Sequence, residues 1–131
     1  MNYLDIFNST NLTPDESDRL KAWMMKGGVT PDKYEGVDFY WCEALGKEIN
    51  GLFTGIMSNR VFLTPCFKSQ LERLAATAAH ELVHRRDFKK NPIMYFFRKL
   101  PFLRAIVLEK EAEEVEKEVN EKLGIDEASR L

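Results

Sequence analysis

Histidine and cysteine are both scarce in this chain of 131 residues, which contains two of each. The cysteines, Cys42 and Cys66, are too few for a disulfide framework, and neither has a CxxC partner. A zinc site built on cysteine is therefore not favoured, and free thiols are expected. Any site chemistry has to come from other side chains.

An excess of one charge is also lacking, since 19 basic residues face 21 acidic ones and the net charge is −2. No general attraction to nucleic acid follows from this balance. Residues 1–11 show no basic segment followed by an apolar run, so no secretory signal is expected. The most apolar stretch, Ile93–Leu108, is interrupted by three basic residues and a proline, which argues against a transmembrane span. A cytoplasmic location is the resulting expectation.

The composition, with 44% hydrophobic and 31% charged residues, is that of a globular protein, and the length fits a single domain over residues 1–131.

The first element predicted along the chain is a helix. Thr13 is placed to cap it, Pro14 suits the first helical position and Glu16 completes a capping box. Gly27 and Gly28 end this predicted helix.

The middle of the chain favours β-strands, because β-branched and aromatic residues concentrate there. We expect strands over Val37–Cys42, Leu52–Met57 and Arg60–Thr64. Ser58-Asn59 is a two-residue connection suited to a tight hairpin between the last two. The prediction is a short, three-stranded, mostly antiparallel sheet.

Two longer helices are predicted after the sheet, which makes the fold class α+β. The first runs from Phe67 to about Phe88, and its apolar face is formed by Leu71, Leu74, Ala75, Ala78 and Leu82. The second runs from about Phe102 to Leu123 and is rich in glutamate. Its inward face is defined by Leu108, Ala112, Val115 and Val119.

Both histidines fall within His80-Glu81-Leu82-Val83-His84, an HExxH motif inside the first of these helices. A spacing of four residues turns both imidazoles to the same side of a helix, one turn apart, where they can share a metal ion. Glu81 follows the first histidine and is placed to deprotonate a metal-bound water. The motif predicts zinc-dependent hydrolysis, most naturally of a peptide bond.

A catalytic zinc ion needs a third protein ligand, and the chain has no third histidine to provide it. A carboxylate of the glutamate-rich last helix is the remaining donor. Glu109 and Glu111 flank the apolar stripe of that helix at similar angles, about 80° from its centre at ~100° per residue. Helical geometry alone does not decide which of these two glutamates is the third ligand.

The HExxH motif followed on a later helix by Glu109-Lys110-Glu111-Ala112-Glu113 resembles the ligand pattern of gluzincin zinc peptidases, of the type ExxA(D/E). The small size and the order of elements look most like the minigluzincins, and peptidases of the ImmA/IrrE type carry a similar arrangement. The resemblance implies that His80, His84 and Glu109 bind Zn²⁺ and that Glu81 is the general base. It also implies that Glu113 orients a histidine.

Many gluzincins have an additional histidine or tyrosine that stabilises the oxyanion. Without a third histidine, Tyr95 is the first candidate for that role, and hydrophobic packing is its alternative. The substrate, a peptide or protein, is expected to add in extended form to the edge of a strand, either Leu52–Met57 or Val61–Thr64.

A second hypothesis rests on the segment from Arg85 to Arg104, which contains seven basic residues and a single acidic one, Asp87. Mixed with aromatic residues, they resemble surfaces that bind nucleic acid or anionic membranes. The alternative function is thus a metal-stabilised binding module without turnover. The sequence does not predict the oligomeric state.

Overall fold

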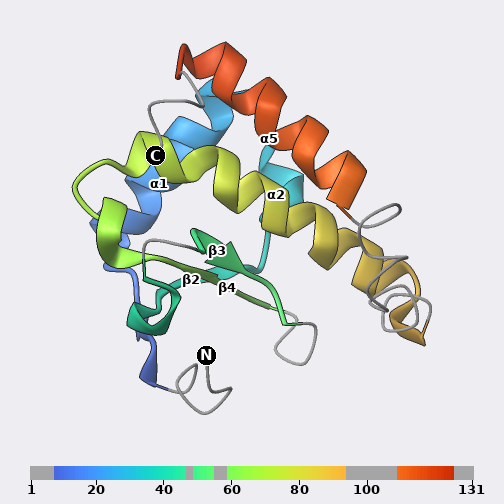
Figure 1. Ribbon diagram of the computed structural model, residues 1–131, viewed down its shortest axis with the longest axis horizontal. Helices are drawn as coiled ribbons and strands as arrows, with labels where there is room; N and C mark the ends of the chain where they lie inside the picture. The colour runs from blue at the N-terminus through green and yellow to red at the C-terminus, as the bar shows by residue number, and fades with distance from the viewer. Residues whose placement is uncertain (1–7, 47–48, 55–58, 94–108, 126–131) are drawn as a thin grey trace.

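Helix α2 (Leu71–Lys90) lies between a small β-sheet and helix α5 (Glu109–Leu123) in the computed structural model of the chain (Figure 1). Helix α1 (Pro14–Lys26) packs against α2 as well and also touches α5. The structure describes residues 8–46, 49–54, 59–93 and 109–125. Within them, the arrangement confirms the predicted α+β class.

The sheet has four strands in the described residues, in the order β1-β2-β4-β3. They are β1 (Thr10–Asn11), β2 (Asp38–Trp41), β3 (Gly51–Leu52) and β4 (Arg60–Leu63). The outer pairs are antiparallel, but the central pair, β2 and β4, is parallel. The prediction of three strands missed β1, whereas the mostly antiparallel character of the sheet is confirmed, because two of the three strand pairs are antiparallel. Strand β1 has two residues and no apolar alternation, so no local pattern indicates it. The parallel pairing of β2 with β4 has no local pattern either, because it depends on the chain topology.

The predicted tight turn at Ser58-Asn59 includes Ser58, which lies outside the described residues, but the register of the two strands differs from the one that this turn requires. Leu52 pairs with Phe62 in the antiparallel contact between β3 and β4. A two-residue connection at Ser58-Asn59 would instead place Leu52 opposite Pro65. The position of β4 is set by its parallel pairing with β2, in which Asp38 lies opposite Arg60. Local turn rules do not contain this non-local constraint.

Helix α1 begins as predicted. The Thr13 hydroxyl accepts a hydrogen bond from the backbone N–H of Glu16, and the Glu16 carboxylate accepts one from the backbone N–H of Thr13. The same carboxylate accepts a hydrogen bond from the indole N–H of Trp41 at 3.2 Å. The capping box thus attaches the start of α1 to strand β2.

Helix α2 starts four residues later than predicted, at Leu71, because Pro65–Phe67 form a separate turn of 3₁₀-helix. In that turn the Thr64 side chain accepts a hydrogen bond from the backbone N–H of Cys66. The predicted apolar face of α2 is confirmed, since Leu71, Leu74, Ala75, Ala78 and Leu82 are all buried. They contribute to the main hydrophobic core with residues of α1 and the sheet.

Helix α5 buries Ala112 and Val119 of its predicted apolar stripe, and Val115 packs against the same core. Gly27 at the end of α1 permits this packing, because a Cβ atom there would lie 2.7 Å from Cγ1 of Val119. The predicted beginning of the helix at Phe102 falls outside the described residues, as does Tyr95. None of the described helices combines the length and the apolar character needed to cross a bilayer.

Candidate metal centre

Helix α2 presents His80 and His84 on the side that faces α5. The two imidazole rings lie one helical turn apart, with centroids separated by 5.1 Å. The His84 side chain is 8% exposed and that of His80 is 16% exposed. The pair is therefore largely shielded from water, but His80 keeps some access to solvent.

Glu109, the first described residue of α5, places its carboxylate between the two imidazoles. Its Oε2 lies 3.1 Å from Nε2 of His80, and its Oε1 lies 3.2 Å from Nε2 of His84. Glu109 comes from a different helix and lies 25 positions after His84 in the sequence, so the packing of α5 on α2 creates the cluster.

These separations are those of direct hydrogen bonds or ion pairs, and they are also compatible with a shared metal ion. Donors around a tetrahedral zinc ion lie about 2.0–2.1 Å from the metal and hence about 3.3 Å from one another. His80, Glu81 and His84 can each also offer a ligand atom, and these atoms lie within 4.8 Å of one another. Nitrogen and carboxylate donors are the types that zinc prefers when cysteine is not used.

Glu116 contacts the other edge of the His80 ring, with Oε2 3.3 Å from Nδ1. Burial disfavours the charged form of His80, but the hydrogen bond to Glu116 and the negative charges of Glu81, Glu116 and Glu109 outweigh it. The pKa of His80 consequently rises to about 9. A carboxylate on Nδ1 also fixes the ring so that Nε2 faces Glu109, which is the usual arrangement of a metal-binding histidine.

The other two glutamates considered for this site point elsewhere. Glu111 forms a bidentate ion pair with Arg86, with distances of 2.6 and 2.8 Å, and this contact lowers its pKa. Glu113 is exposed, and the position expected for it beside a histidine is filled by Glu116. Glu109 and Glu116 are seven residues apart, which places them two turns apart on one face of the helix. This spacing gave Glu116 no role in the prediction, because its contact with His80 depends on how α5 packs against α2.

Glu81 is 8% exposed and lies against strand β3. A Cβ atom at Gly51 of strand β3 would lie 3.3 Å from Cγ of Glu81 and 2.6 Å from Cγ2 of Thr77. Glycine therefore allows β3 to approach α2 closely at the residue predicted to be the base. Within the described residues, β3 is an edge strand whereas β4 is paired on both sides.

Comparison of the chain with protein-family models, with curated proteins and with solved structures returned no match. The resemblance to gluzincins stays a prediction from the sequence motifs.

The basic stretch predicted as an anionic-surface site is partly used within the molecule. Arg85 is buried, and its guanidinium donates to Oδ1 of Asn59 at 3.4 Å. Arg86 pairs with Glu111 and with Asp87. Lys89 and Lys90 are exposed, and the remainder of the stretch, residues 94–104, lies outside the described residues. Its binding to nucleic acid or membranes stays a prediction.

Proposed function

We propose that this protein is a zinc-dependent metallopeptidase in which His80, His84 and Glu109 hold the metal ion. The observation that carries the proposal is the carboxylate of Glu109, which lies within 3.2 Å of Nε2 of both histidines. Three protein ligands leave a fourth coordination position for solvent or substrate, as catalytic rather than structural zinc sites do.

When bound, zinc lowers the pKa of a coordinated water and polarises a substrate carbonyl. Glu81 then has the role of general base, since it neighbours the histidine pair on the same helix turn. It accepts the proton of the attacking water and afterwards delivers that proton to the departing amine. Glu116 holds the ring of His80 and takes no part in the proton transfer.

The outer edge of β3 is the proposed binding site for the peptide. Within the described residues no other strand pairs with that edge, and Gly51 brings the strand close to Glu81. The other strand considered for this purpose, Val61–Thr64, corresponds to β4, whose two edges are already paired with β2 and β3. Peptide addition at β3 would place the scissile bond next to the base.

The proposal is tested by combining metal analysis with an assay of peptide hydrolysis. The Glu81→Gln variant should retain about one zinc ion per chain, because no ligand is removed, whereas hydrolysis of an unfolded protein substrate should fall by about 100-fold or more. A wild-type protein that binds less than half an equivalent of zinc in non-chelating buffer would contradict the metal site.

A second pair of variants tests the third ligand. Glu109→Ala should lower the zinc content strongly, because it removes a donor that lies near both imidazoles. Glu111→Ala is the matched control, since it removes the same charge from the same helix but breaks an ion pair with Arg86. Greater zinc loss in Glu111→Ala than in Glu109→Ala would assign the ligand to Glu111.

A further inference from the structure

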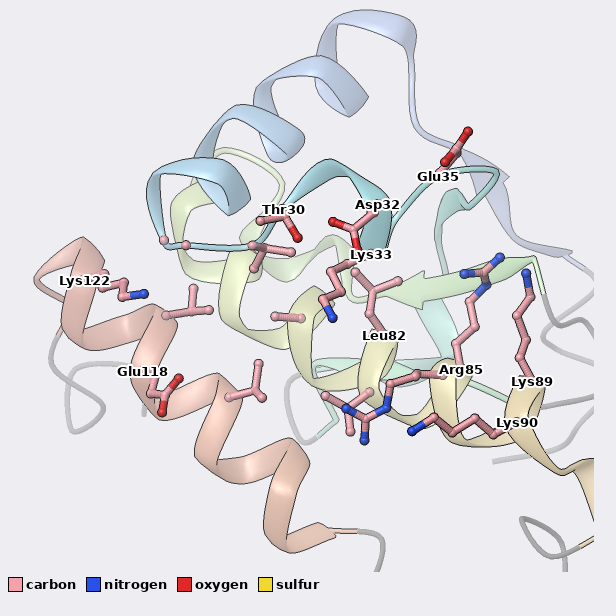
Figure 2. A pocket seen from close by; sticks show the side chains of 18 residues that line it. Thr30, Asp32, Lys33, Glu35, Leu82, Arg85, Lys89, Lys90, Glu118 and Lys122 are labelled. Carbon is pink, nitrogen blue, oxygen red and sulfur yellow. The ribbon is translucent and has the colours of Figure 1, made fainter.

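A cavity of about 700 Å³ lies on the opposite side of the α2–α5 contact from the histidines. Its walls come from the end of α1 and the segment after it, from α2 and from α5 (Figure 2). His80, Glu81, His84, Glu109 and Glu116 do not line it. The cavity is therefore separate from the candidate metal centre, although both lie between the same two helices.

The floor of the cavity is apolar. Leu82 and Val83 of α2 and Val115 and Val119 of α5 contribute most of it, and Ala79 adds to it. Val119 is buried, as are Leu82 and Val83. A floor of this kind favours the hydrocarbon part of a ligand and offers little to a phosphodiester backbone.

Cationic side chains surround this floor. Six basic and three acidic residues line the cavity. Lys33, Lys90 and Lys122 extend toward its interior from three different segments (Figure 2). Among the described residues none of these three lysines forms an ion pair. They are consequently available to a negatively charged group that enters the cavity.

Acidic groups near the cavity do not cancel this charge. Glu111, beside the rim, forms its ion pair with Arg86, and the charges of Lys90 and Lys33 act on it more weakly. Glu35 points away from the cavity in Figure 2. Asp32 and Glu118 are the remaining acids of the lining, which also contains six basic residues. The lining therefore keeps an excess of positive charge above an apolar floor.

We propose that this cavity binds a small amphipathic anion, namely a free organic acid with an aliphatic or aromatic body and one terminal carboxylate. The volume is within the range of small-ligand pockets, about 300–1,000 Å³. The apolar floor takes the body, and the lysines take the anionic group. A polyanion or an extended acidic peptide would use the lysines but would leave the floor uncovered.

Octanoate is a suitable probe, and it is titrated into the protein well below the concentration at which it forms micelles. Backbone amide shifts in two-dimensional NMR should change for Gly28, Val83 and Val119, which line the cavity. Octan-1-ol lacks the charge and acetate lacks the body, so both should bind more weakly than octanoate. Binding of octanoate should also weaken as ionic strength rises.

Variants then separate the two parts of the site. The double variant Lys33→Gln/Lys122→Gln should bind octanoate about tenfold more weakly and octan-1-ol unchanged. The matched control is Lys110→Gln/Lys117→Gln, which removes two exposed charges that do not line the cavity. Val115→Phe should weaken binding of octanoate and octan-1-ol alike, because it fills the apolar floor.

Three results would overturn the proposal. Shifts confined to the surroundings of His80 and His84 would assign octanoate to the candidate metal centre. Equal losses in the double variant and in its control would show a nonspecific charge effect. Binding of an acidic peptide or of phosphatidylglycerol vesicles without binding of octanoate would assign the cavity to a macromolecule or a membrane. None of these results bears on zinc content or on hydrolysis, so this proposal and the proposed function fail independently.

Discussion

At the scale of single residues, the candidate metal centre depends on contacts at both ring nitrogens of His80. Glu116 holds Nδ1 of His80 and Glu109 lies at Nε2. The HExxH spacing predicted that the two imidazoles lie on the same side of a helix and that Glu81 beside them is the base, because a helix turns residues four apart to the same side. It could not predict Glu116, whose contact depends on the rotation and distance of a second helix.

Replacing Glu116 by glutamine should lower the pKa of His80 in the metal-free protein below its value of about 9, because the hydrogen bond and charge that raise it are weakened. The pKa is measured by following the ring proton shifts of His80 during a pH titration by NMR. Glu113→Gln is the control, since Glu113 is an exposed glutamate of the same helix.

The same shift predicts how stability depends on pH. His80 has a higher pKa in the folded protein than its ordinary value of 6.5, so its protonation stabilises the fold fully below pH 6.5. This contribution is lost as the pH rises through about 9. The metal-free wild type should therefore lose unfolding free energy over this interval, and Glu116→Gln should lose less. An unchanged His80 pKa in Glu116→Gln would contradict both expectations.

At the scale of secondary-structure elements, features encoded by neighbouring residues could be predicted and those set by distant contacts could not. The start of α1 was predicted because Thr13 and Glu16 are three residues apart. The parallel pairing of β2 with β4 joins segments on either side of β3 and has no local signal. The positions of Glu109 and Glu111 on either side of the apolar stripe were equivalent until the packing of α5 against α2 distinguished them.

The capping box of α1 gives a prediction at this scale. Thr13→Ala removes the hydroxyl that accepts the backbone N–H of Glu16 and should reduce the free energy of unfolding by about 1 kcal/mol. Urea denaturation followed by circular dichroism measures the change. Thr30→Ala is a matched control, because Thr30 precedes a 3₁₀-helix without a side-chain capping bond. Equal losses in the two variants would argue against the capping contribution.

At the scale of the whole molecule, the contact between α2 and α5 forms both regions for which a function is proposed. On one side it brings Glu109 to the histidines, and on the other it forms the floor of the cavity. The HExxH motif predicted His80 and His84 as donors of the proposed metal site, whereas Glu109 was chosen over Glu111 only by the resemblance to gluzincins. The sequence did not predict the cavity, because the lining residues come from separate segments and share no local pattern.

A metal ion held by residues of both helices should stabilise their contact and hence the entire fold. Zinc at about 100 times its dissociation constant should raise the free energy of unfolding by about 2.7 kcal/mol, because the ion binds the folded state in preference to the unfolded one. Thermal unfolding with and without zinc, and after removal of zinc by a chelator, measures this effect. Magnesium is the control, since it prefers oxygen donors in octahedral geometry and should have no comparable effect. In Glu109→Ala the zinc effect should shrink, because the metal would then contact α2 alone. Equal stabilisation by zinc in Glu109→Ala and in the wild type would mean that the ion does not join the two helices.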